Sequence, residues 1–178
     1  MFNKNKDFPW IHIFEDHWIV VRDELMALHP DTFKPWPETA FFNKGWTTFG
    51  LYAWTVKLDI NCAKCPKTTA LIEQVPGLIS CGFSSMQPGT HILPHSANPQ
   101  GILRLHVPLK VPGKAVFRVA NETKEWVEGK CFVFDDSQEH EAINYSDGVR
   151  VVMLVDFEGG DLVINSPPPP KWFQKLLR

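Results

Sequence analysis

Histidine and arginine side chains recur on short β-rich runs in the second half of the chain. In the run Ile102–Val107, successive side chains of a strand would point to opposite faces, which places Arg104 and His106 together on one face. The same alternation places His91 and His95 on one face of the run 91–95. Imidazole is a common ligand of Fe, Zn, Cu and Ni, and a guanidinium group binds carboxylates. These runs therefore indicate a metal site beside an anion site.

Two further candidates lie downstream. The apolar run Cys131–Phe134 leads into an acidic turn that ends at His140. Arg150 begins the nearly continuous apolar run Val151–Val155, which is typical of a fully buried strand. A buried arginine needs an anionic partner, because an unpaired charge in the interior is costly. A redox metal bound by two imidazoles would keep open coordination positions, which the activation of oxygen requires.

Each of these residues also has an ordinary structural explanation. A single histidine on a strand commonly makes a structural hydrogen bond, and an arginine commonly pairs with an acidic side chain. Four acidic residues near His140 could supply that partner, namely Asp135, Asp136, Glu139 and Glu141. The residues taken singly therefore leave the structural and the functional interpretations open.

The elements that position these side chains follow from periodicity and turn signals. Short β-rich runs follow one another from Leu78 onward, separated by turns that contain Pro and Gly, and this pattern favours a sandwich, a jelly roll or a small barrel. Upstream we expect a helix from Asp16 to about Leu28, a strand over Trp46–Leu58 and a short helix over Thr68–Val75.

The length of 178 residues is that of one domain. Within a single domain 1–178, we expect a helical and irregular N-terminal wrap over 1–77, a jelly-roll core over 78–165 and a Pro-rich C-terminal tail with a short helix over 166–178. The tail is basic and amphipathic. It could lie on its own domain or on a dimer mate, or it could dock on a partner or a membrane surface.

Composition excludes several classes of protein. The 18 basic and 20 acidic residues give a net charge of −2, so the basic surface of a nucleic-acid binder is missing. No apolar run reaches the length of a transmembrane segment and no signal sequence is evident, so we expect a cytoplasmic protein. Four cysteines are too few for a disulfide scaffold, and we interpret Cys62 to Cys65 as a loop with two free thiols.

Several segments match a known family in order and spacing. They are Ser84 to His95, Leu103 to His106, Ala120 to Lys130, Phe134 to Ser137, His140-Glu141 and Arg150. Together they resemble the aspartyl/asparaginyl β-hydroxylase family over roughly Cys62 to Phe157. The resemblance implies a mainly β, double-stranded β-helix fold (a cupin-like jelly roll) with flanking N-terminal helices. It also implies an Fe(II)- and 2-oxoglutarate-dependent dioxygenase that uses O2 to hydroxylate its substrate.

The resemblance assigns the metal ligands. It makes His95 and His140 the iron ligands and leaves His91 a supporting or structural role. The wider oxygenase superfamily adds a carboxylate two positions after the first histidine, but Ala97 stands there in this chain. This agrees with the β-hydroxylase family, whose iron lacks that carboxylate. Asp136 could orient a water molecule on the metal, or it could cap its own turn.

The same matching assigns the cosubstrate contacts. Arg150 corresponds to the arginine that binds the distal carboxylate of 2-oxoglutarate, and Ser84, Arg104 and His106 correspond to its other contacts. A guanidinium group suits this task, because its fork matches a carboxylate and keeps its charge at any working pH.

Two departures from the animal enzymes affect the substrate. Ile102 stands where those enzymes carry an arginine that meets the substrate carboxylate, and Gly82 stands where they carry a basic residue. An aspartyl side chain of a secreted, disulfide-rich domain is therefore not the expected substrate. Another amino acid, a peptide or a lipid acyl chain remains open, and Ile102 favours an uncharged or apolar reacting group.

Two other classes of protein remain open. The first is a non-catalytic jelly-roll module that binds a metal or a small acid without turnover. The second is a cupin-type Zn or Mn enzyme, such as an isomerase. The combination of His95, His140, Arg104 and Arg150 favours catalysis over the binding module. Metal analysis combined with a test of 2-oxoglutarate dependence would exclude the isomerase. The expected partner is thus a small-molecule, peptide or lipid substrate, with no nucleic acid, and the oligomeric state is left open.

Overall fold

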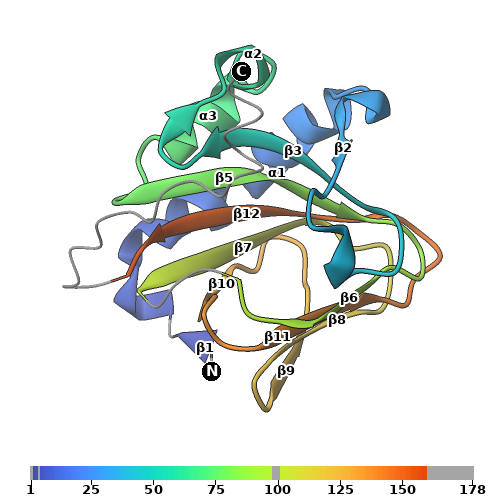
Figure 1. The fold of residues 1–178 in the computed structure, drawn as a ribbon. Helices are drawn as coiled ribbons and strands as arrows, with labels where there is room; N and C mark the ends of the chain where they lie inside the picture. Colours follow the sequence, from blue (N-terminus) through green and yellow to red (C-terminus); the bar gives the residue numbers. More distant parts are fainter. Residues whose placement is uncertain (1, 4, 98–100, 160–178) are drawn as a thin grey trace.

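The computed structural model describes residues 2–3, 5–97 and 101–159. Within these ranges two β-sheets face each other, and helices pack on the outer side of the larger one (Figure 1). The predicted C-terminal tail, 166–178, lies outside the described residues. No helix in the described ranges is long and apolar enough to cross a membrane.

The larger sheet has eight strands among the described residues. Seven follow the order β1-β10-β7-β12-β5-β3-β2, and β4 pairs with β3. The strands are β1 (Phe2–Asn3), β2 (Lys34–Pro35), β3 (Trp46–Ala53), β4 (Val56–Lys57), β5 (Leu78–Met86), β7 (Ile102–Lys110), β10 (Phe132–Asp135) and β12 (Arg150–Glu158). The central pairs are antiparallel, as a jelly roll requires.

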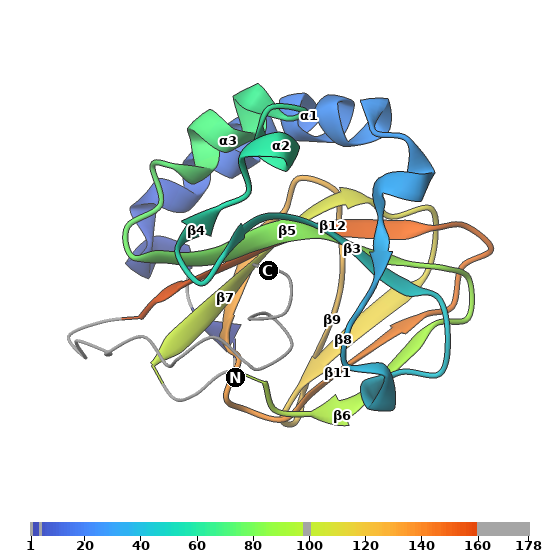
Figure 2. The ribbon, with the colours of Figure 1, turned by 45° about the horizontal axis from the view of Figure 1, so that its top comes forward.

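The smaller sheet has the order β6-β11-β8-β9. Its strands are β6 (His91–His95), β8 (Ala115–Val119), β9 (Glu122–Glu125) and β11 (His140–Asn144). Figure 2 shows this sheet across the interior from β7 and β12, with the helices on the far side of the larger sheet. The mainly β, jelly-roll prediction is confirmed.

Within the described part of the chain, three α-helices cover the larger sheet. They are α1 (His12–Ala27), α2 (Asp59–Cys62) and α3 (Pro66–Ile72). The prediction that Asp16 begins the first helix is wrong, because a 3₁₀ turn at Pro9–Ile11 leads directly into α1 and buried Phe14 lies in its first turn. The helix predicted at Thr68–Val75 begins earlier and ends earlier, since Pro66 fits the first turn of a helix.

The single strand predicted over Trp46–Leu58 is a hairpin. Trp54 and Thr55 both have positive φ angles, of 46° and 65°, and reverse the chain between β3 and β4. Two consecutive residues with positive φ are typical of the tight turns that join antiparallel strands. The alternating pattern of the sequence continues through this turn and so conceals it.

Strand alternation divides the apolar side chains into two cores. One face of the larger sheet packs against the helices through residues such as Phe83, Leu105 and Met153. The other face points to the smaller sheet, and this second core contains Trp46, Met86, Phe117, Trp126, Phe132, Phe134 and Val152. The polar residues that share the second face must therefore lie between the two sheets.

The N-terminal helix is fastened to the rest of the molecule by its acidic side chains. The carboxylate of Glu24 accepts hydrogen bonds from the backbone amides of Lys67 and Thr68, at 2.9 and 2.7 Å, at the start of α3. Glu15 accepts one from the amide of Cys131 at 3.0 Å. The two bonds from Glu24 satisfy donors at the start of α3 that would otherwise lack a partner.

All four cysteines are buried and free. The prediction of free thiols at Cys62 and Cys65 is confirmed, but the loop is wrong, because Cys62 ends α2 and Cys65 immediately precedes α3. Both side chains pack in the core beneath the helices.

Candidate active site

A cavity of about 340 Å³, open mouth included, lies between the two sheets. Its lining comes from the strands of both sheets and consists of Trp46, Ser84, Ile92, His95, Arg104, His106, Phe117, Phe134, His140, Ala142, Arg150 and Leu154. Only His95, Arg104 and Leu154 in this set are partly exposed, so they mark the opening. All six predicted site residues, Ser84, His95, Arg104, His106, His140 and Arg150, therefore line one cavity.

His95 and His140 face each other across the pair β6 and β11, with their ring centroids 4.3 Å apart. The Nδ1 atom of His95 lies 2.7 Å from the carbonyl oxygen of Leu93, and that of His140 lies 2.8 Å from the carbonyl oxygen of Gln138. Because a carbonyl oxygen only accepts, the proton of the neutral ring lies on Nδ1 in both residues, and Nε2 is the atom with the lone pair. Such a backbone contact is the usual way of orienting a histidine that binds a metal.

Burial keeps the second imidazole neutral. Burial first, and the neighbouring His95 second, lower the pKa of His140 to about 3. A metal binds the neutral form of imidazole, so no proton competes for Nε2 at neutral pH. Phe41 stacks on the ring of His95, with the centroids 5.0 Å apart, and limits its movement at the opening.

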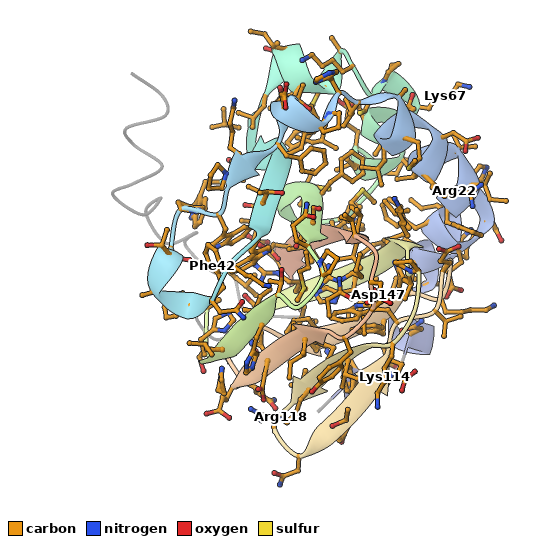
Figure 3. The ribbon with its side chains drawn as sticks, turned by 90° about the vertical axis from the view of Figure 1, so that its right-hand side faces the viewer. Arg22, Phe42, Lys67, Lys114, Arg118 and Asp147 are labelled. Carbon is orange, nitrogen blue, oxygen red and sulfur yellow. The ribbon has the colours of Figure 1, made fainter. Side chains whose placement is uncertain are left out.

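The prediction that His91 and His95 share a face is wrong. Two steps along β11, from His140 to Ala142, match three steps along β6, from His95 to Ile92. This bulge turns His95 into the cavity and leaves His91 outside it. His91 instead contacts Glu141, with Nε2 2.6 Å from Oε1, and the same carboxylate binds Arg118. Figure 3 shows Arg118 at the outer side of the smaller sheet.

The two neighbouring aspartates at the end of β10 have different roles. Asp135 caps the turn, because its Oδ1 accepts from the amide and the hydroxyl of Ser137. Asp136 is completely buried and lies inside, with Oδ1 3.5 Å from His140 Nε2 and 2.9 Å from Arg104 Nη1. Asp136 is thus the carboxylate beside His140. Capping of the turn, which the sequence offered as the alternative role of Asp136, is the role of Asp135.

Arg104 is held between two carboxylates. Its Nε and Nη2 donate to the two oxygens of Asp156 at 2.6 and 2.9 Å, and its Nη1 pairs with Asp136. Burial by itself would lower the pKa of Arg104, but the two carboxylates outweigh burial and raise it above its ordinary value. The face predicted for Arg104 is confirmed, and its role as a 2-oxoglutarate contact stays a prediction.

Arg150, unlike Arg104, has no carboxylate beside it among the described residues. It is only 2% exposed, and its contacts are the carbonyl oxygen of Ser84 at 3.3 Å, the sulfur of Met86 at 2.6 Å and the ring of Trp126, 4.1 Å below the guanidinium carbon. Its Nε has no hydrogen-bond partner, and no acidic side chain pairs with it, among the described residues. Burial lowers the pKa of Arg150 to about 9, so it is still a cation at neutral pH.

The remaining polar groups of the lining can donate to an anion. Trp126 Nε1 donates to His106 Nδ1 at 3.1 Å, so the ring proton of neutral His106 is on Nε2. Burial, with Arg150 and Arg104 nearby, lowers the pKa of His106 well below its ordinary value and keeps it neutral. Ser84 Oγ accepts from Trp46 Nε1 at 2.9 Å, which leaves its hydroxyl proton free to donate.

Three residues of this network were not predicted: Trp46, Trp126 and Asp156. Trp126 lies within the matched segment Ala120 to Lys130, so its place in that motif was a usable signal. Asp156 lies on the same face of β12 as Arg150, six residues along the strand, and directly opposite Arg104 in the sheet. That position follows from strand pairing, which the sequence does not show.

Comparison with known proteins agrees with this arrangement. Residues 15–159 match the family model described as aspartyl/asparaginyl beta-hydroxylase. The chain belongs to this family. Its fold is also found in a predicted oxalate decarboxylase from Thermotoga maritima, with a TM-score of 0.50, 12% identity, and coverage of 71% of this chain and 92% of that one. This second likeness concerns the cupin fold alone.

Relatives in the family act on different kinds of molecule, as their names state. The chain is 37% identical over 161 residues to the ornithine lipid ester-linked acyl 2-hydroxylase of Rhizobium tropici, which covers 84% of this chain and 57% of that protein. It is 35% identical over 151 residues to the human aspartyl/asparaginyl beta-hydroxylase, covering 80% of this chain and 20% of that protein. The chain thus spans only part of the length of both relatives.

Proposed function

We propose that this protein is an Fe(II)- and 2-oxoglutarate-dependent dioxygenase that hydroxylates an amino-acid, peptide or acyl substrate. One observation carries the proposal. Two imidazoles with free Nε2 lone pairs share a cavity with Arg150, a buried cation that has no acidic partner among the described residues. A metal and a small acid are the two kinds of ligand that such groups bind.

The histidine pair would hold the metal through the Nε2 atoms of His95 and His140. Two protein ligands leave room for a bidentate cosubstrate and for oxygen, and Asp136 lies close enough to His140 to orient water beside the metal. When bound, Fe(II) activates O2, and oxidation of 2-oxoglutarate to succinate and CO2 lets one oxygen atom enter a C–H bond of the substrate.

The deeper part of the cavity would bind the cosubstrate. A carboxylate near Arg150 would supply the negative charge that the guanidinium lacks, and the hydroxyl of Ser84 and the Nε2–H of His106 could donate to it as well. The aromatic rings of Phe117 and Phe134 line the walls and exclude water. Because these groups are already fixed by Trp46 and Trp126, binding would require little reorganisation.

Two measurements test this proposal. Isothermal titration calorimetry, with Mn(II) in place of Fe(II), should show binding of 2-oxoglutarate that depends on the metal. With Fe(II), ascorbate and 2-oxoglutarate, the protein should release succinate slowly even when no substrate is added. Metal-dependent binding without any succinate would instead favour a binding module, and absence of binding would exclude the proposal.

A further inference from the structure

The two proposed metal ligands differ in how firmly their rings are packed. His140 is 4% exposed and begins β11, and the rings of Phe134 and Phe117 contact it from the core, with centroids 5.2 and 5.9 Å away. His95 is partly exposed and ends β6, which lies at one end of the described strand order of the smaller sheet. Its backbone contact at Nδ1 sets the proton position but does not fix the tilt of the ring. His95 therefore requires a further contact to keep Nε2 directed at a metal.

The ring of Phe41 supplies this contact. It stacks on the imidazole of His95 with the centroids 5.0 Å apart and the planes inclined by 17°. A nearly parallel ring opposes tilting of its neighbour, because tilting breaks the contact on one side of the ring and causes overlap on the other. Contacts that orient a histidine influence how well it binds its metal. Phe41 therefore limits the directions in which the Nε2 lone pair of His95 can point.

Phe41 belongs to a segment that runs along β6, on the side away from β11. We call this segment, 36–43, the strap, and both ribbon views show it beside β6 (Figure 1, Figure 2). The backbone amide of Asn43 donates to the carbonyl oxygen of His91 at 3.2 Å, and Asn43 Oδ1 accepts from the amide of His91 at 2.8 Å. The strap thus satisfies polar groups at the outer side of β6 that a strand there would otherwise present to solvent.

Aromatic contacts fasten the strap to the cavity wall on either side of Phe41. Phe42, which Figure 3 labels, forms a bridge with Ile92 and meets the ring of Trp46 edge-on, with the centroids 5.5 Å apart. Trp36 stacks on the same indole at 4.1 Å, and its amide donates to the carbonyl oxygen of Trp46 at 3.0 Å. The backbone on both sides of Phe41 is therefore held in place, and its ring has a fixed support.

We propose that Phe41 is a positioning residue for the metal. It holds the imidazole of His95 at the angle at which Nε2 faces the metal, so the strap and the metal stabilise each other. The proposal rests on the proposed function, because it requires a metal at His95 and His140. Phe41 acts through His95 and supplies no donor atom of its own. Coupling of this kind is reciprocal, so it can be measured from the metal and from the strap.

The first experiment measures the binding of Co(II) alone, as a stand-in for Fe(II), by calorimetry and by the visible absorption of the bound ion. Phe41→Leu keeps an apolar side chain but loses the flat ring, and its affinity for Co(II) should fall about fivefold. At saturating Co(II) its absorption bands should differ from those of the wild type, because the imidazole meets the ion at another angle. Phe41→Tyr keeps the ring and should restore both the affinity and the bands.

Phe42→Leu is the matched control. It removes the neighbouring ring of the same strap, which contacts Trp46, and its affinity for Co(II) should not change. Thermal melts without metal establish that each variant is folded. If Phe41→Leu binds Co(II) as the wild type does, or if the two leucine variants lose affinity equally, Phe41 does not position His95.

The second experiment needs no variant of Phe41. Hydrogen exchange of the strap amides is followed by mass spectrometry with and without saturating Co(II). The amides of Phe41 and Asn43 both donate hydrogen bonds, and bound metal should slow their exchange because the metal and the strap stabilise each other. His140→Ala is the control, since it loses a proposed ligand and the same Co(II) concentration should not protect its strap. If Co(II) leaves the exchange of the wild-type strap unchanged, the proposal is overturned.

These outcomes are separate from the test of the proposed function. Neither experiment depends on 2-oxoglutarate or on succinate release. If the wild-type protein binds no Co(II), the proposed metal site fails, and the role of Phe41 fails with it. If the wild type binds Co(II), His95→Ala does not, and Phe41→Leu binds normally, the metal site stands and only the role of Phe41 is wrong.

Discussion

The indole of Trp126 donates a hydrogen bond to Nδ1 of His106 at 3.1 Å, and its ring lies 4.1 Å from the guanidinium carbon of Arg150. One side chain thus sets the proton position of the imidazole and supports the only arginine of the described lining that lacks an acidic partner. Both effects prepare the cavity for an anion before any anion is bound. Preorganisation of this kind reduces the cost of binding.

The hydrogen bond from Trp126 can be tested separately from its ring. Trp126→Phe keeps an aromatic face under Arg150 but removes the Nε1–H donor. We expect 2-oxoglutarate binding to weaken about fivefold, since one buried hydrogen bond contributes about 1 kcal/mol. Calorimetry with Mn(II) measures this change. Trp18→Phe is the matched control, because Trp18 lies on α1 and packs against the core beneath the helices, and the affinity of this variant for 2-oxoglutarate should not change.

The metal assignment separates three histidines of two neighbouring strands. His95→Ala and His140→Ala should each lower the affinity for Mn(II) or Fe(II) by at least about a hundredfold, because each removes one of two protein ligands. His91→Ala should leave metal affinity unchanged, since His91 pairs with Glu141 outside the cavity. Metal titration by calorimetry distinguishes the two cases. Equal losses in all three variants would contradict the assigned ligands.

Some of the site could be predicted because the local pattern is regular. β7 continues without a bulge through Arg104 and His106, so alternation alone places both side chains in the interior. The neighbouring strand β6 does not follow this rule, because its bulge between Ile92 and His95 depends on pairing with β11. A single sequence contains no record of that pairing, and so the same reasoning failed for His91.

The expected acidic partner illustrates a second limit. The sequence left open that an acid near His140 could pair with an arginine, and Asp136 does so for Arg104. Arg150, which begins the more apolar run, has no such partner among the described residues. The second acid on Arg104 is Asp156, its cross-strand neighbour in the larger sheet. Which arginine receives the acids therefore depends on strand register and not on composition.

The burial of the thiols predicts that they react slowly with an alkylating reagent. Burial raises the pKa of Cys65 to about 12, and burial also raises the pKa of Cys81 and Cys131 well above the ordinary value. A raised pKa keeps the thiol protonated at pH 8, where about one Cys65 in ten thousand is the reactive thiolate. We expect iodoacetamide to label the native protein far more slowly than the guanidinium-unfolded protein, in which four thiols react. Equal rates in the two states would contradict the buried positions.

We expect Arg150 to stabilise the complex with 2-oxoglutarate and to destabilise the ligand-free protein. Its buried charge has no acidic partner among the described residues, and replacing such a cation by an apolar side chain of similar volume commonly stabilises a fold. Arg150→Met should therefore raise the melting temperature of the ligand-free protein by a few degrees, at about 1 kcal/mol of added stability. The same variant should weaken the binding of 2-oxoglutarate at least about thirtyfold, because it loses a charge-assisted contact worth about 2 kcal/mol.

The control is Arg118→Met, on the outer side of the smaller sheet. It should neither raise the melting temperature nor weaken the binding of 2-oxoglutarate. A variant that loses stability and keeps its affinity would show that Arg150 is a structural residue, whereas a gain in stability with a loss of affinity identifies a cation retained for its ligand.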